Sequence, residues 1–146
     1  MSEIIRPKVQ LESPFGASTR EGLVTNVAYA LIAMRDSLAR GEAPFASHLL
    51  YTQMLDDTDE HERTVGIEAG LVIGQHAELT AVYEDLGVSR GMHYGIERAD
   101  AERRPVVYRK LFDTALAYDE LAAQIHADSP LPLDVIESVY ARIHKD

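Results

Sequence analysis

The segment from residue 79 to residue 109 constrains the fold of this chain more than any other. Two strand-like runs, Leu79–Tyr83 and Pro105–Arg109, flank the small-residue turn Ser89-Arg90-Gly91 and a short helical stretch that extends to Ala99. Two strands joined through a helix form a βαβ unit, in which the strands run parallel. A Ser-x-Gly turn that opens a helix offers backbone N–H groups and a hydroxyl to an anionic or sugar-bearing ligand. The segment therefore predicts a parallel sheet with a ligand site at the carboxyl end of its strands.

The first forty residues predict a strand, a loop and a helix. Residues 8–13 alternate polar and apolar side chains, as a half-buried strand does, and residues 14–18 break this pattern with proline and glycine. Apolar residues then recur at helical spacing from about Glu21 to Arg40, which predicts an amphipathic helix. Gly41 follows directly and is typical of a helix C-terminus.

The next part of the chain predicts a second strand, an acidic link and a second helix. Residues 44–51 are interpreted as a short strand that runs into a loop, and residues 56–62 as an acidic link with helix-capping side chains. A helix is expected from about residue 58 to residue 76, with glycine at positions 66, 70 and 74. Each glycine costs up to about 1 kcal/mol of helix propensity. The four-residue spacing places the three glycines in a stripe on one face of the helix, and we expect close packing of this stripe against a sheet or another helix to compensate for the cost.

After Lys110 the pattern becomes purely helical. One helix is expected around Leu116, Leu121 and Ile125, and a second around Leu133, Ile136, Tyr140 and Ile143, with residues 128–132 between them. The alternating order predicts an α/β fold, a small Rossmann-like parallel sheet of about four to five strands with helices on both faces. We expect residues 1–110 to form the ligand-binding core and residues 111–146 a C-terminal helical extension of the same domain.

Composition narrows the classes of function. The 146 residues suit one domain, and 46% hydrophobic with 26% charged residues is typical of a folded protein. A net charge of −10 argues against binding of a nucleic acid polymer, which needs Lys and Arg to neutralise phosphates. The absence of cysteine excludes disulfides and thiolate zinc sites. No apolar run is long enough to span a membrane, and the first eight residues lack the apolar centre of a signal peptide, so we expect a cytoplasmic protein.

The candidate ligand-binding residues fall at the ends of the predicted strands and at the turn before the motif helix. They are Ser13, Pro14, Phe15, Gly16, His48, Tyr51, Asp85, Ser89, Gly91 and Met92. Open parallel sheets bind ligands outside the carboxyl ends of their strands, which is where these residues are expected. Each also has a purely structural interpretation, as part of a strand-to-helix turn, as a polar loop residue or as a helix N-cap.

No motif predicts a metal site or a bound cofactor. In the acidic link, Asp57, Asp59 and His61 alternate as in a calcium loop, but Glu62 stands where that loop needs glycine. The histidines show no paired zinc-ligand spacing, and neither a Gly-x-Ser-x-Gly elbow nor a phosphate-binding Gly-Lys-Ser/Thr loop is present. We therefore expect no metal and no cofactor, and the motifs assign no catalytic residue.

The order of these motifs resembles the nucleoside 2-deoxyribosyltransferase-like Rossmannoid family over about residues 8–110. The resemblance rests on residues 13–16 (SPFG), on Ser89-x-Gly91-Met92 followed by Glu97, Ala99 and Pro105-Val106, and on residues 40–51 (RGEAPFASHLLY). The last stretch is similar to small uncharacterised members from phages and bacteria. Characterised relatives cleave or exchange the N-glycosidic bond of nucleosides or nucleotides, so the resemblance implies a ligand of that class.

The resemblance also implies two carboxylates that this chain lacks at the expected positions. The family's nucleophilic glutamate, in the first turn of the motif helix, falls at Gly95, and a supporting acid falls near Gly70. Glu97 and Glu68 lie two residues away from these positions. Two residues turn a helix by about 200°, so these side chains are expected to face elsewhere.

Three functions follow from this pattern. The first is a protein that binds a nucleotide- or nucleoside-derived small molecule without cleaving it, for sequestration or sensing, as a phage protein that captures a nucleotide immune signal would. The second is an N-glycosidase or deoxyribosyltransferase with relocated acids drawn from Glu12, Glu68, Asp85 and Glu97. The third is a structural oligomer with a vestigial cleft. The apolar stripes of the C-terminal helices suit packing on the sheet of their own subunit or against another copy, and we expect a homo-oligomer. Pockets in the resembled family lie near subunit contacts, so the resemblance implies that a neighbour completes the site.

Overall fold

Four parallel strands in the order β2-β1-β3-β4 form the centre of the computed structural model, which describes residues 3–141. The strands are β1 (Lys8–Glu12), β2 (Ala43–Phe45), β3 (Leu79–Tyr83) and β4 (Val106–Arg109). This confirms the predicted Rossmann-like α/β class. The chain leaves β1 to form β2 on one side and returns to form β3 on the other, so the strand order reverses between β1 and β3.

Helices lie between these strands, and two more follow β4. They are α1 (Arg20–Ala39), α2 (Ser47–Leu50), the 3-10 helix η1 (Tyr51–Gln53), α3 (Glu60–Gly74), α4 (Arg90–Ala101), α5 (Tyr118–Asp128) and α6 (Leu133–Tyr140). The side chains of Thr19, Asp59 and Ser89 cap α1, α3 and α4 by accepting a hydrogen bond from a backbone N–H of the first turn. Gly41 has a φ of +84°, the left-handed conformation expected of a glycine that follows a helix.

The sequence predicts a short strand that runs into a loop over residues 44–51; the strand is confirmed, and the loop is wrong. Only Ala43–Phe45 pair with β1, and α2 and η1 follow at once. His48 and Tyr51 therefore lie in short helices and do not end a strand. The cause is length, because a four-residue helix is too short to show the 3.6-residue period that would separate it from a strand.

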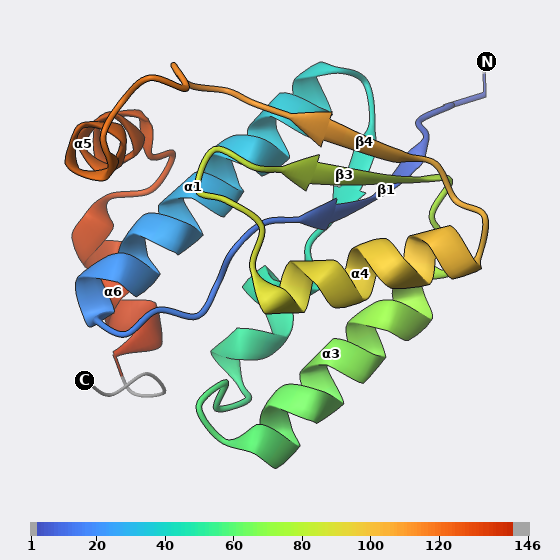
Figure 1. Cartoon of the computed structure of the whole chain (residues 1–146), viewed down its shortest axis with the longest axis horizontal. Coiled ribbons are helices and arrows are strands. Elements are labelled where there is room, and N and C mark those ends of the chain that lie inside the picture. Colours follow the sequence, from blue (N-terminus) through green and yellow to red (C-terminus); the bar gives the residue numbers. More distant parts are fainter. Residues whose placement is uncertain (1–2, 142–146) are drawn as a thin grey trace.

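The helices divide between the two faces of the sheet (Figure 1). The first group, α1, α5 and α6, packs together on one face, whereas α3 and α4 contact each other on the opposite face. The C-terminal helices thus bury their apolar stripes against α1 of their own chain. The predicted Ile143 lies outside the described residues.

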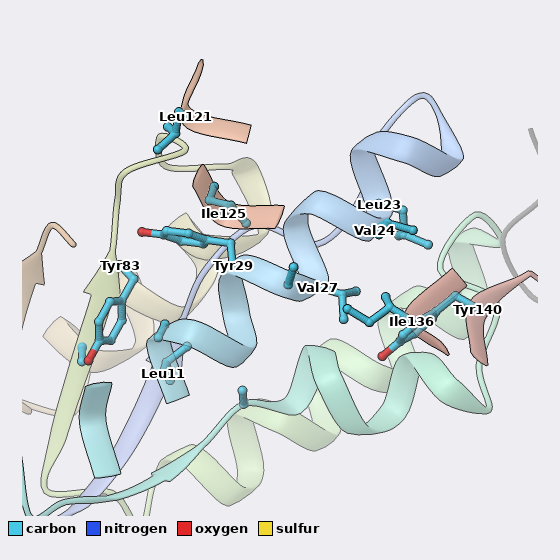
Figure 2. Packing of buried hydrophobic residues seen from close by; sticks show 14 of the residues in the cluster. Leu11, Leu23, Val24, Val27, Tyr29, Tyr83, Leu121, Ile125, Ile136 and Tyr140 are labelled. Carbon is cyan, nitrogen blue, oxygen red and sulfur yellow. The ribbon is translucent and has the colours of Figure 1, made fainter. Parts of the chain in front are cut away.

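Alternation along β1 and β3 sorts side chains between these faces. Val9, Leu11 and Tyr83 join the hydrophobic core beneath α1, together with Leu121 of α5 and Ile136 of α6 (Figure 2). The intervening residues Gln10 and Glu12 of β1 point toward α3 and α4. One face of the sheet therefore carries the apolar core, and the other carries polar side chains.

The glycine stripe of α3 packs closely, as predicted. A Cβ atom placed on Gly70 would lie 2.5 Å from Oγ of Ser47 in α2, and one on Gly74 would lie 3.1 Å from Oε1 of Gln10. Larger residues would push α3 away from the sheet. Within residues 3–141, no helix is long and apolar enough to cross a membrane.

Candidate functional site

A cavity of about 100 Å³ lies on the α3–α4 face, at the carboxyl end of β1. Its walls come from β1 and the following loop (Gln10, Glu12, Ser13, Phe15, Gly16), from α2 (Ser47, His48), from the segment before α3 and from α3 (Asp57, Arg63, Ile67, Gly70, Leu71), and from the start of α4 (Ser89, Gly91, Met92, Tyr94, Gly95). The site lies beside the point between β1 and β3 where the strand order reverses. Open α/β sheets place ligands at such a crevice.

Most of the residues predicted from sequence come together here. Ser13, Phe15, Gly16, His48, Ser89, Gly91 and Met92 line this cavity, and Tyr51 lines an adjoining one of about 60 Å³. Pro14 and Asp85 line neither cavity. The structure thus assembles the two predicted glycine-containing turns and α2 into a single site.

Asp85 has a structural task that explains its position outside the cavity. Its carboxylate accepts a hydrogen bond from the Tyr29 hydroxyl at 2.6 Å and further ones from the backbone N–H groups of Leu111 and Phe112 at 2.9 and 3.0 Å. These bonds tie the segment after β4 to α1. These contacts give no support to the predicted role of Asp85 as a ligand-binding residue.

The carboxyl group of Glu12, at the end of β1, lies beside Gly95 of α4. A Cβ atom placed on Gly95 would collide with the Glu12 carboxylate, so the absence of a side chain in α4 is what admits the β1 carboxylate. Nε2 of Gln10 donates a hydrogen bond to Oε2 of Glu12 at a long 3.4 Å. A buried carboxylate with one weak hydrogen bond is poorly compensated.

The protonation of Glu12 follows from this environment. Burial raises the pKa of its carboxyl from 4.5 to about 7, although the Gln10 hydrogen bond and the positive charge of Arg104 oppose the shift. Near neutral pH the group can therefore either donate or accept a proton. The other acids considered for relocation lie elsewhere: Glu68 and Glu97 are exposed and do not line the cavity.

Ser13 and His48 form the second polar feature of the cavity. Oγ of Ser13 lies 2.7 Å from Nε2 of His48, which joins the segment after β1 to α2. The His48 ring keeps some surface exposure, yet the protein atoms packed around it lower its pKa to about 4. The imidazole is therefore neutral at physiological pH and offers one donor and one acceptor.

Arg63 and Asp57 form an ion pair at the edge of the cavity. Nε of Arg63 lies 3.8 Å from Oδ1 of Asp57, and a Cβ atom placed on Gly91 would lie 3.6 Å from Nη2 of Arg63. The guanidinium thus sits beside the N-terminus of α4, where the first backbone N–H groups have no acceptor within the helix. This combination suits an anionic group of a ligand.

Replacing Glu12 with glutamine is expected to change how stability depends on pH. Between pH 4.5 and about 7 the unfolded chain has lost the Glu12 proton while the folded chain still holds it. Unfolding then releases a proton, so this group makes the unfolding free energy fall as pH rises through that window. Glutamine removes the effect, and the variant should exceed the wild type by roughly 2–3 kcal/mol at pH 8 but not at pH 4.5.

Urea unfolding of both proteins from pH 4 to pH 8.5 measures this difference. The matched control is Glu97→Gln on the exposed face of α4, which should follow the wild type at every pH. Parallel curves for the wild type and Glu12→Gln would show that Glu12 titrates normally in the folded protein.

Several lining residues were not among the predicted contacts, notably Gln10, Ser47, Asp57, Arg63 and Gly95. The alternation of β1 could have identified Gln10, because a strand that buries Val9 and Leu11 on one face must present residues 10 and 12 on the other. Arg63 gives no local signal, since only the packing of α3 beside α4 brings it to the cavity.

Comparison with protein families places residues 7–109 in a family described as a domain of unknown function, DUF7768. The chain belongs to this family. The DUF7768 match ends at Arg109, so α5 and α6 lie beyond it. Comparison with curated proteins finds no match. Among solved structures, the chain is similar to a 2-deoxyribosyltransferase from the psychrotolerant bacterium Bacillus psychrosaccharolyticus, with 16% identity, a TM-score of 0.49, and coverage of 89% of this chain and 90% of that chain.

Proposed function

We propose that this DUF7768 protein binds a nucleoside- or nucleotide-derived small molecule in the cavity between β1, α3 and α4. One observation carries the proposal: the cavity combines two kinds of polar group. Arg63 and the N-terminus of α4 lie at its mouth, and Glu12 and the Ser13–His48 pair form its polar interior. The mouth suits a phosphate, and the interior suits the hydroxyl or amine groups of a sugar or base. The sequence resemblance described above supports the same ligand class.

The size of the cavity defines how such a ligand would sit. About 100 Å³ is well below the roughly 300–1,000 Å³ of pockets that enclose drug-sized ligands. We therefore expect one ring to enter the cavity while the rest of the ligand lies along the surface, near Tyr51 and the adjoining cavity. If the ligand leaves intact, the role is sequestration or sensing.

Glu12 favours a second candidate function, cleavage of an N-glycosidic bond. Of the acids considered for relocation, Glu12 is the one that lines the cavity, and a carboxyl with a pKa of about 7 can protonate a departing base. The expectation of binding without cleavage rested on the missing carboxylates at positions 70 and 95. Because Glu12 places a carboxyl group in the cavity, this argument against cleavage is weaker. The experiment must therefore measure both ligand binding and ligand cleavage.

The test uses the purified full-length chain with a panel of nucleosides, nucleotides, NAD and cyclic nucleotide messengers. Thermal shift reports binding, and chromatography of the ligand released by heating reports chemistry. A raised melting temperature with intact ligand supports binding without cleavage, whereas free base in the eluate supports the glycosidase. No shift with any compound would overturn the proposed ligand class.

Replacing Arg63 with alanine is expected to weaken binding of phosphorylated ligands about tenfold or more, because a hydrogen bond to a charged group is worth about 1.5–3 kcal/mol. Affinity for the corresponding unphosphorylated nucleoside should change little. Isothermal titration calorimetry with a matched nucleoside and nucleotide measures both. Arg98→Ala, an exposed position on α4 outside the cavity, controls for the loss of one positive charge. If the nucleoside and the nucleotide lost the same affinity, the result would show that Arg63 does not bind the phosphate.

We also propose that the chain assembles as a homo-oligomer, through a surface other than the apolar stripes of α5 and α6, which pack against α1. Exposed apolar side chains on α3 (Val65, Val72 and Ile73) are available to such an interface. Light scattering during size-exclusion chromatography of the same sample tests this, and a monomeric mass would reject it.

A further inference from the structure

Tyr140, the last residue of α6, contacts two walls of the cavity from outside. Its ring packs against that of Phe15, with the centroids 5.7 Å apart, and its hydroxyl donates a hydrogen bond to the backbone carbonyl of Leu49 at 3.3 Å. Phe15 lies in the loop after β1 and lines the cavity. Leu49 belongs to α2 and directly follows His48, another lining residue. Tyr140 lies beyond residues 7–109, which match the family, and it contacts both the loop after β1 and α2.

The same two segments are joined inside the cavity by the hydrogen bond between Ser13 and His48. Ser13 lies two residues before Phe15, and His48 lies one residue before Leu49. The loop after β1 and α2 are therefore connected twice, once by Ser13–His48 within the site and once by Tyr140 behind it. A shift of either segment relative to α6 would change the 2.7 Å contact between Ser13 and His48.

Tyr140 is held in place by the hydrophobic core between α1 and α6. Tyr140 is 4% exposed and belongs to the hydrophobic core, and Val27, Ile136 and Tyr140 lie in a row between α1 and α6 (Figure 2). From the same direction, Asn26 of α1 donates a hydrogen bond to the carbonyl of Phe15 at 2.8 Å. An aromatic pair adds a directional attraction to the burial of its area, which favours this position of the loop.

We propose that Tyr140 is a positioning residue, which holds the loop after β1 and α2 at the separation that lets Ser13 and His48 share a hydrogen bond. The ring contact carries more of this effect than the hydroxyl, because Nε2 of Gln53 also donates to the Leu49 carbonyl, at 2.6 Å. The proposal concerns the shape of the site and goes beyond the proposed function, since it holds for any ligand.

The test follows the His48 ring by nitrogen-15 NMR during pH titration of the full chain, with the signal assigned through His48→Gln. Close packing lowers the pKa of His48 to about 4 in the wild type. In Tyr140→Ala the two segments are expected to separate and admit water, so the midpoint should rise by about one unit or more toward the unperturbed 6.5.

The matched control is Ile136→Ala on the same helix. Ile136 is 1% exposed in the core beneath α1 and does not line the cavity, so its truncation should lower stability while the His48 midpoint stays within about 0.3 units of the wild type. An unchanged midpoint in Tyr140→Ala, or an equal rise in Ile136→Ala, would overturn the proposal.

Two further variants keep the result decisive if a truncation prevents folding. Tyr140→Leu retains apolar bulk but loses the ring and the hydroxyl, and Ile136→Val removes a single methyl group; the same comparison of midpoints applies. Failure of the nucleotide panel would leave this test intact, because its readout needs no ligand. The two proposals can therefore fail separately.

Discussion

Replacing Gly95 with alanine is expected to abolish ligand binding and to lower the unfolding free energy by about 1–3 kcal/mol, the usual cost of overpacking. The added methyl group would occupy the place of the Glu12 carboxylate, which must then move into the cavity or displace α4. The loss should outweigh the gain of about 1 kcal/mol in helix propensity that alanine brings to an exposed helix position. Urea unfolding and thermal shift with the panel ligands measure the two effects.

A double-mutant cycle identifies the cause. In Glu12→Ala/Gly95→Ala the methyl group has room, so stability should recover to at least the wild-type value while binding stays lost. Gly66→Ala is the matched control for the stability measurement, because a Cβ on this α3 residue would meet Cδ1 of Leu55 at an ordinary 3.4 Å. It is not used for the binding measurement, since Gly66 lines the adjoining cavity. Additive losses in the double variant would mean that Glu12 and Gly95 do not compete for the same space.

Replacing Glu42 with alanine is expected to cost about 3 kcal/mol of stability through loss of a buried ion pair. Glu42 accepts hydrogen bonds from Nη1 and Nη2 of Arg109 at 2.8 and 2.7 Å, and from Oγ of Ser37 at 2.7 Å. Removal of one partner of a buried pair leaves the other charge uncompensated and costs about 3–5 kcal/mol; we expect the lower value because the side chains of Arg109 and Glu42 remain 10% and 11% exposed.

The same pair adds a dependence on acid. The Arg109 hydrogen bonds hold the pKa of Glu42 below its usual value of 4.5. Its contribution to stability is therefore complete above about pH 4.5 and disappears as pH falls through the lower pKa of the folded state. Unfolding curves at pH 7 and pH 3 should show a smaller difference between wild type and Glu42→Ala at the lower pH. Arg40→Ala, which breaks the exposed pair with Asp36, should cost under about 1 kcal/mol.

The sheet and the long helices follow from sequence because their signals extend over many residues. The strand predicted at Leu79–Tyr83 matches β3 at both ends, and the helix expected from Glu21 to Arg40 agrees with α1 to within one residue at each end. The helical structure of residues 47–53 could not be predicted from the sequence, because α2 and η1 are each too short to show a helical period. Their form depends instead on packing against the glycine stripe of α3.

The candidate site was predictable only in part. Turns that open helices have local signatures, so Ser13, Ser89 and Gly91 could be placed at a common edge before the structure was known. The link between Glu12 and Gly95 has no such signature, since 83 positions separate a strand residue from a helix residue. Only the crossing of α4 over the end of β1 brings the Glu12 carboxylate against Gly95.

The alternation of β1 also limits how this chain can change during evolution. Leu11 lies in the core under α1, whereas the next residue, Glu12, lies in the cavity under α4. A single inserted or deleted residue within the strand would exchange the two faces, sending a carboxylate into the apolar core and a leucine into the cavity. Substitutions can alter the core or the cavity separately, but any change in the length of β1 alters both at once. Insertions in related chains are therefore expected in the loops that flank this strand.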